Sequence, residues 1–173
     1  MERLFLAVVP DAVTAARIHR LAGVLKRAHG FSGRLIERDR LHVSLFFLGG
    51  LPEHMVRAAC DGLADVRMPP FDIAFDRSVS FRGRPGSRPF VLIGDDGPSE
   101  LKSFRQALGG ALMRKGLQRR ASTNFTPHVT LVYDARSVDE HPIAEPVCWA
   151  VNEFVLIRSL NGHAHLLKWP LRA

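Results

Sequence analysis

The chain has 173 residues, 46% of them hydrophobic and 24% charged, so it is long enough to bury a core as one domain or as two tightly fused halves. Its apolar runs are shorter than the roughly 18 residues of a membrane span, and its two cysteines lack metal-type spacing, which argues against a membrane partner or a disulfide framework and favours a cytoplasmic protein. The net charge of +7 favours a polyanionic partner such as nucleic acid, although a GC-rich genome also produces basic composition.

Strand-like and helix-like patterns alternate along the chain. Helices are expected after the capping residue Asp11 and after Pro52, where apolar residues recur at helical spacing. The predicted helices cover residues 11–28, 52–66 and 99–115. The predicted strands cover residues 4–9, 34–36, 41–48, 71–81, 90–93, 128–133, 149–160 and 164–169, with the last two paired across Asn161-Gly162. Residues 137–145 are expected to form a loop.

A basic segment at residues 82–89 is the natural boundary between two halves. It contains Arg82, Arg84 and Arg88 together with two glycines and two prolines. A solvated linker would need no function, whereas the rim of a cleft would place these arginines near a phosphodiester chain, and both interpretations stay open. A second basic cluster, at the end of the third predicted helix, is explained by the helix dipole; it consists of Arg114, Lys115, Arg119 and Arg120.

A histidine precedes a hydroxyl residue by two positions at two strand-like places. Leu41-His42-Val43-Ser44-Leu45 and Pro127-His128-Val129-Thr130-Leu131 share the order histidine, valine, hydroxyl residue, leucine. Side chains alternate faces along a strand, so each imidazole and hydroxyl should lie side by side, with the valine and leucine in the core. An imidazole that can be protonated near neutral pH beside a hydroxyl donor suits a phosphate-like anion.

The two motifs lie 86 residues apart (128 − 42), and other features repeat at the same spacing. The shift places the run 4–8 on 90–94, the helix 11–28 on 97–114, and Gly30 on Gly116. Few side chains are identical, so two unrelated strand-helix-strand units remain the alternative. A true repeat predicts a pseudo-twofold axis that brings His42 and His128 to opposite walls of one cleft.

Two histidines that face each other across a basic cleft can cleave a phosphodiester without metal. A neutral imidazole takes a proton from the attacking water or hydroxyl, and a protonated one gives a proton to the leaving oxygen. Ser44 and Thr130 would hold the non-bridging oxygens. Such a pair predicts that the reaction rate follows a bell-shaped curve with pH. The apparent pKa of the proton donor should lie above the ordinary histidine value of about 6.5, and that of the proton acceptor below it.

Residues 42–49 and 125–131 resemble the two His-x-Thr/Ser-x signatures of the two-histidine phosphoesterase superfamily. Within it, the chain is most similar to the bacterial and archaeal RNA 2',3'-cyclic phosphodiesterases, formerly called 2'-5' RNA ligases. The likeness extends to residues 3–7, to the basic segment before 90–93, and to residues 154–159 and 168–171.

This resemblance implies an α+β fold in which two antiparallel sheets, related by a pseudo-twofold repeat, line a central cleft with helices outside. The lobes would cover about 1–84 and 85–173, with an exchange of strands at the C-terminus. The implied activity is hydrolysis of an RNA 2',3'-cyclic phosphate to a 2'-phosphomonoester by a monomer without metal or other cofactor, with ATP-independent 2'-5' ligation as the reverse reaction. His42 would protonate the leaving 3' oxygen and His128 would activate water. The expected partner is RNA with a cyclic phosphate end, for which tRNA-derived RNA is a candidate.

The chain departs from the family where many members carry an arginine five residues after the second motif histidine. Tyr133 occupies this position, so phosphate binding must depend on other cations, among which Arg158 is a candidate with a solvated position as the equal alternative. Tyr133 itself can stack on a base or donate one hydrogen bond. Phe5 is expected mainly in the core, and is the candidate for an aromatic contact with the substrate.

Other histidines and acids offer weaker alternatives. His163 and His165 would share a strand face and could chelate a metal, but no third ligand is evident, and a solvent-facing pair is expected. Asp95-Asp96 is typical of a turn and helix cap. The functional alternatives are a noncatalytic RNA-binding module, a metal-dependent phosphoesterase, and a two-histidine phosphodiesterase for a small cyclic nucleotide or a 2'-5' linked oligonucleotide.

Overall fold

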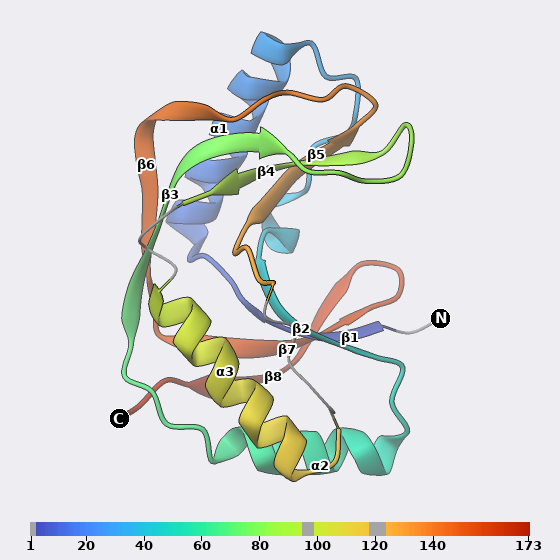
Figure 1. Ribbon diagram of the computed structural model, residues 1–173, viewed down its shortest axis with the longest axis vertical. Coiled ribbons are helices and arrows are strands. Elements are labelled where there is room, and N and C mark those ends of the chain that lie inside the picture. Colours follow the sequence, from blue (N-terminus) through green and yellow to red (C-terminus); the bar gives the residue numbers. More distant parts are fainter. Residues whose placement is uncertain (1–2, 95–98, 118–123) are drawn as a thin grey trace.

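The computed structural model describes residues 3–94, 99–117 and 124–173, and this part of the chain contains eight strands, three α-helices and one short 3-10 helix (Figure 1). Its elements are, in order, β1 (Arg3–Val8), α1 (Ala12–His29), the short 3-10 helix η1 (Arg38–Arg40), β2 (Val43–Gly49), α2 (Glu53–Ala64), β3 (Phe71–Ser80), β4 (Arg88–Ile93), α3 (Ser99–Arg114), β5 (Val129–Asp134), β6 (His141–Val151), β7 (Glu153–Ser159) and β8 (His163–Pro170).

The strands form two four-stranded antiparallel sheets, with the orders β2-β1-β7-β8 and β5-β4-β3-β6. In each sheet a motif strand occupies one edge and pairs with a central strand, β2 with β1 in the first sheet and β5 with β4 in the second. The predicted α+β class with two antiparallel sheets is therefore confirmed. The motif strands β2 and β5 are both edge strands.

Both sheets draw on strands from before and after residue 84. The expected boundary falls in the hairpin between β3 and β4, which pair with each other in one sheet. The C-terminal strands β7 and β8 join β1 and β2 in the other. The helices are exchanged as well, because α1 packs on β5 and β6, whereas α3 packs on β2 and on α2 (Figure 1).

The ends of α1 and α3 support the predicted repeat at atomic detail. Gly30 and Gly116 both have positive φ, 69° and 71°, a left-handed conformation that favours glycine. The N–H of Gly30 donates to the carbonyl of Arg27, and the next N–H, of Phe31, donates to the carbonyl of Lys26. The corresponding bonds follow Gly116 at the same spacing, since it donates to Met113 and Leu117 donates to Leu112.

Two predictions about the C-terminal part were wrong. Residues 141–145, expected in a loop, begin β6, where Ser78 pairs with His141 and Arg77 with Pro142. The stretch is polar and contains proline, which an edge strand tolerates. Residues 149–160, expected as one strand, divide at Asn152, where the chain leaves one sheet and enters the other.

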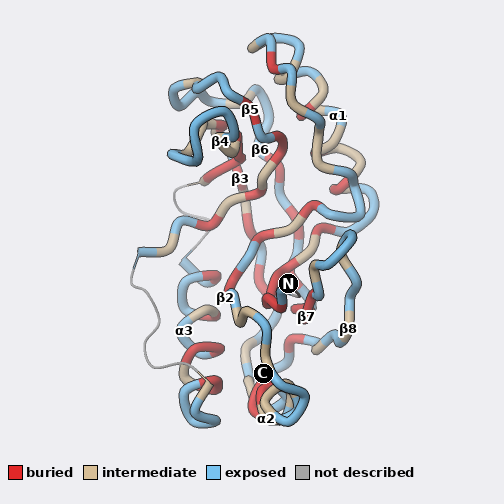
Figure 2. Tube along the Cα trace, turned by 90° about the vertical axis from the view of Figure 1, so that its right-hand side faces the viewer, coloured by how far each residue is buried: buried red, intermediate tan, exposed pale blue. Residues whose placement is uncertain are grey.

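The main core lies between the sheets and their helices. Figure 2 shows buried residues along one side of α3 and through the central strands, with exposed residues on the outer surface. A second, small cluster covers the opposite face of the first sheet and consists of Phe5, Ala7, Val155 and Ile157. No helix in the described part of the chain is long and apolar enough to span a membrane. Asp95-Asp96, Arg119 and Arg120 lie outside the described residues.

Candidate active site

The segment that leads to His42 is fastened to the strand that follows His128. Leu35 forms a bridge with Val132, and the N–H of Ile36 donates to the carbonyl of Leu131 at 2.9 Å. The two motifs are thus joined by backbone hydrogen bonds on the free edge of β5.

Asp134, at the end of β5, secures the start of this segment. Its buried carboxylate accepts hydrogen bonds from the backbone N–H groups of Ser32 and Gly33, each at 2.7 Å, and of Arg136 at 2.8 Å. These bonds hold the pKa of Asp134 below its usual value, so the carboxylate is ionised at neutral pH. A charged acceptor of this kind gives stronger hydrogen bonds than a neutral one.

The predicted alternation of side chains is present in both motifs. Val43 and Leu45 are buried while Ser44 is exposed, and Val129 and Leu131 are buried on either side of Thr130. As a result His42 and Ser44 lie on the same side of β2, with the Nε2 of His42 3.0 Å from the Oγ of Ser44.

The backbone fixes the tautomer of both motif histidines. The Nδ1–H of His42 donates to the carbonyl of Arg40 at 2.7 Å, and that of His128 donates to the carbonyl of Thr126 at 2.8 Å. His141 makes the same contact with Asp139 at the start of β6, so this bond belongs to a histidine that begins a strand and does not by itself indicate catalysis. Its consequence here is that Nε2 is the nitrogen left for a ligand.

Both histidines and both hydroxyl residues line one cavity of about 180 Å³. Since His42 and Ser44 come from the first sheet and His128 and Thr130 from the second, the cavity lies between the sheets. Tyr133 completes the wall together with Ile36, Arg40 and His163, which the sequence pattern does not link to the motifs. The full lining is Ile36, Arg40, His42, Ser44, His128, Thr130, Tyr133 and His163.

The pKa of His42 is lowered in the unliganded cavity. Burial is the main cause, and electrostatic interactions with His128, Arg40 and His165 act in the same direction, while the hydrogen bond to the carbonyl of Arg40 opposes them. His42 is therefore mainly neutral at pH 7, and the hydroxyl of Ser44 donates to its Nε2. This direction is opposite to the raised pKa expected of a proton donor.

Aromatic rings support both imidazoles from behind. Phe5 packs on His42 with 5.0 Å between ring centroids, and Phe81 packs edge-on against His128 at the same distance. Phe5 is only 8% exposed and is not among the residues that line the cavity, so the structure places it as a packing partner. Phe81 was predicted only as the last residue of the strand 71–81, and no sequence signal linked it to His128.

The other predicted contact residues occupy different positions. Tyr133 is 49% exposed and lines the cavity. Arg158, in β7, lines a neighbouring hollow formed by the turn between β7 and β8. Arg40, at the end of η1, was not named from the sequence, and its position two residues before a motif histidine was the available signal.

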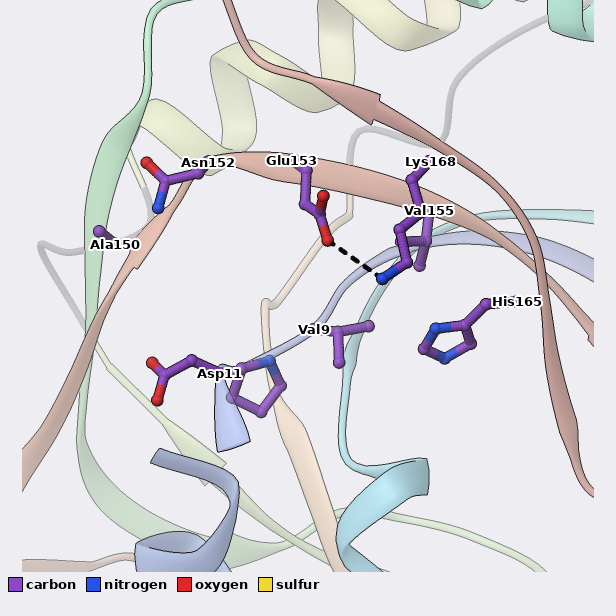
Figure 3. A pocket seen from close by; sticks show the side chains of 9 residues that line it. Val9, Asp11, Ala150, Asn152, Glu153, Val155, His165 and Lys168 are labelled. Atoms are coloured by element: carbon purple, nitrogen blue, oxygen red, sulfur yellow. Dashed lines mark ion pairs between the residues drawn. The ribbon is translucent and has the colours of Figure 1, made fainter. Parts of the chain in front are cut away.

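His163 and His165 face different cavities. His163 lines the cavity of the two motifs, whereas His165 lines a second cavity of about 290 Å³ where the chain crosses between the sheets (Figure 3). In this second cavity Lys168 pairs with Glu153 at 3.5 Å. Within the described residues, no group of three or more His, Cys, Asp or Glu side chains is arranged to hold a metal ion.

Comparison with known proteins adds independent information. Residues 9–163 match the model of the 2'-5' RNA ligase superfamily. A protein of Archaeoglobus fulgidus named RNA 2',3'-cyclic phosphodiesterase is 31% identical over 131 residues, which are 75% of this chain and 70% of that protein. A crystal structure described as a phosphoesterase superposes with a TM-score of 0.79 at 25% identity over the whole of both chains. E. coli LigT in its apo form has a TM-score of 0.77 at 28% identity, covering 99% of this chain and 98% of LigT. LigT complexed with 3'-AMP has a TM-score of 0.75 at 25% identity over 98% of both chains.

Proposed function

Because the chain belongs to the 2'-5' RNA ligase superfamily of phosphoesterases, we propose that it hydrolyses RNA 2',3'-cyclic phosphate ends to 2'-phosphomonoesters with His42 and His128 as its acid–base pair. The observation that carries the proposal is that both histidines and both hydroxyl residues line one cavity. The name of the Archaeoglobus relative and the complex of LigT with 3'-AMP support a nucleotide phosphate as the ligand.

In the proposed reaction the Nε2 of His128 accepts a proton from water, whose oxygen attacks the phosphorus. The bond from phosphorus to the 3' oxygen breaks, and His42 gives its proton to that oxygen, so the products are a 2'-phosphomonoester and a 3' hydroxyl. Each proton transfer contributes about 10²- to 10⁴-fold. The 2'-5' ligation is the same displacement with the 5' hydroxyl of a second RNA in place of water, so that a 2'-5' phosphodiester and a 3' hydroxyl are formed.

The lowered pKa of His42 is compatible with its role as donor if the substrate supplies the missing charge. The permanent positive charge of Arg40 is among the causes that lower it, and a bound phosphate anion opposes this effect. His42 then takes up a proton as the substrate enters. Once protonated, Nε2 no longer accepts from Ser44, which frees the hydroxyl hydrogen of Ser44 for a phosphate oxygen and leaves the Nε2–H for the leaving 3' oxygen.

The basic hairpin between β3 and β4 supports RNA as the substrate. Phe81, which packs on His128, is followed directly by exposed Arg82 and Arg84. An RNA strand that leaves the cavity on this side would meet both guanidinium groups, and Arg40 adds a permanent positive charge at the cavity wall. Binding that relies on such contacts weakens as salt is added.

The decisive experiment is product analysis on a short RNA with a 2',3'-cyclic phosphate end. We expect the wild type to yield only the 2'-phosphate, and His42→Ala and His128→Ala to lose at least about 10²-fold in kcat/KM. His54→Ala, at an exposed position on α2, is the matched control and should keep full activity. Circular dichroism verifies that each variant is folded.

Other outcomes of the same assay identify the alternatives. Full activity in either histidine variant would remove the acid–base pair from the proposal. RNA binding without turnover would indicate a noncatalytic module, and loss of activity in chelator would indicate a metal-dependent enzyme. Faster turnover of a small cyclic nucleotide or a 2'-5' linked oligonucleotide would change the substrate within the family.

A further inference from the structure

His163 is a third imidazole in the wall of the candidate active site. It is the first residue of β8 and follows the turn that joins β7 to β8. Its ring packs edge-on against His42, with 5.1 Å between centroids, and against Phe5 at 5.4 Å. The three rings form a packed group on the first sheet, and His163 extends the wall of the cavity beyond His42.

The hydrogen bonding of His163 differs from that of the motif histidines. Its Nδ1 is buried and has no hydrogen-bond partner among the residues that the structure describes. His42 and His128 instead use Nδ1 to bind a backbone carbonyl. A buried N–H without a partner is rarer and more costly than a buried acceptor, so the proton of a neutral His163 belongs on Nε2. Nε2 is then a donor available to a ligand.

The surroundings of His163 keep its ring neutral. Burial lowers its pKa to about 4, and His42 just before β2, Arg40 on η1 and His165 on β8 add to this effect, while Asp39 on η1 opposes it. Arg158 on β7 lies beside the same turn. A neutral donor can bind an anion at pH 7 without exchanging protons with the acid–base pair.

We propose that His163 binds the substrate directly, with Nε2–H donating a hydrogen bond to an oxygen of the phosphate group held between His42 and His128. This inference rests on the proposed function for the identity of the ligand. It gives His163 a role in binding the phosphate, separate from the transfer of protons.

Substitution of His163 separates binding from proton transfer. His163→Phe keeps a ring against Phe5 and His42 but removes the donor, and we expect the Kd for inorganic phosphate and the KM for cyclic phosphate RNA to rise about 10- to 100-fold. Both limbs of the pH profile should remain. His163→Gln offers an amide N–H near the same place and should recover most of the loss. His54→Phe, on the exposed side of α2, is the control and should change neither value.

The wild-type protein gives a second test that no folding defect can affect. In nitrogen NMR of the histidine rings, saturating inorganic phosphate should shift the Nε2 signal of His163 together with those of His42 and His128. If phosphate shifts the two motif histidines but not His163, and His163→Phe binds phosphate normally, the inference is overturned while the proposed function stands. If phosphate shifts none of the three rings and cyclic phosphate RNA is not turned over, both fail.

Discussion

Gly33 offers a sharp test of how the two motifs are joined. A Cβ atom added at this residue would lie 2.0 Å from the carbonyl oxygen of Tyr133 and 2.9 Å from the Cγ2 of Val132. Contacts of Cβ below 3.0 Å are essentially never seen, so the two backbones must separate by roughly 1 Å. Tyr133 cannot yield easily because it pairs with Pro89 in β4, and Asp134 holds the N–H of Gly33 at 2.7 Å.

Gly33→Ala should therefore affect both stability and catalysis. Strain of this kind costs about 1–3 kcal/mol, which in a chain of this size lowers Tm by about 2–12 °C. The displaced segment continues to Ile36 and Arg40, which line the cavity. A shift of about 1 Å at a catalytic site can cost on the order of 10²-fold, so we expect a loss of this size in kcat/KM.

The measurements are urea unfolding and steady-state kinetics on cyclic phosphate RNA. Gly23→Ala, inside α1, is the matched control because its added Cβ makes an ordinary contact of 3.7 Å with Arg27. The free energy of unfolding of this control should rise by about 0.5–1 kcal/mol, and its activity should stay at the level of the wild type. If Gly33→Ala unfolds and reacts as the wild type does, the segment is not tightly fixed to β5 and the reasoning is refuted.

Three further predictions concern the cavity. Ser44→Ala removes the hydroxyl 3.0 Å from the Nε2 of His42 and should lower kcat/KM about 10-fold; unchanged kinetics would separate Ser44 from the reaction. Because burial lowers the pKa of His42, and a proton donor must be protonated, the alkaline limb of kcat/KM should lie below about 6.5; a limb well above pH 7 would assign the donor elsewhere. Since the pKa of His163 is about 4 in the folded state and about 6.5 when unfolded, the unfolded chain binds the proton more tightly, and the free energy of unfolding should fall as pH drops from about 6.5 to 4. In urea titrations at several pH values, His163→Phe should weaken this dependence of the free energy of unfolding on pH. A dependence as steep as that of the wild type would contradict the lowered pKa of His163.

Local pattern was sufficient to predict the elements around the motifs. Alternating burial at Val43 and Leu45 follows from strand geometry, and the end of α1 follows from the conformational freedom of Gly30. The repeat at 86 residues then indicated that distant segments are equivalent. For this reason four residues named from the sequence, His42, Ser44, His128 and Thr130, are found in one cavity.

Features that depend on long-range pairing could not be predicted in the same way. The polar start of β6 is a strand because β3 offers it an edge, and residues 149–160 divide because the chain must cross at Asn152 to reach the other sheet. His163 was considered only as a partner for His165, at the usual spacing of a strand. Its position beside His42 results from the strand order β2-β1-β7-β8, and this order cannot be derived from the spacing of residues in the sequence.

The exchange of helices and strands between the lobes has a consequence for how the protein can be divided. A cut between Arg84 and Ser87 would leave β3 on one fragment and its partners β4 and β6 on the other. Neither fragment would then contain all the strands of either sheet. Neither half should fold alone, and an equimolar mixture should assemble by complementation. The intact chain should melt in a single cooperative step, which keeps the two motif histidines in register for as long as the protein is folded.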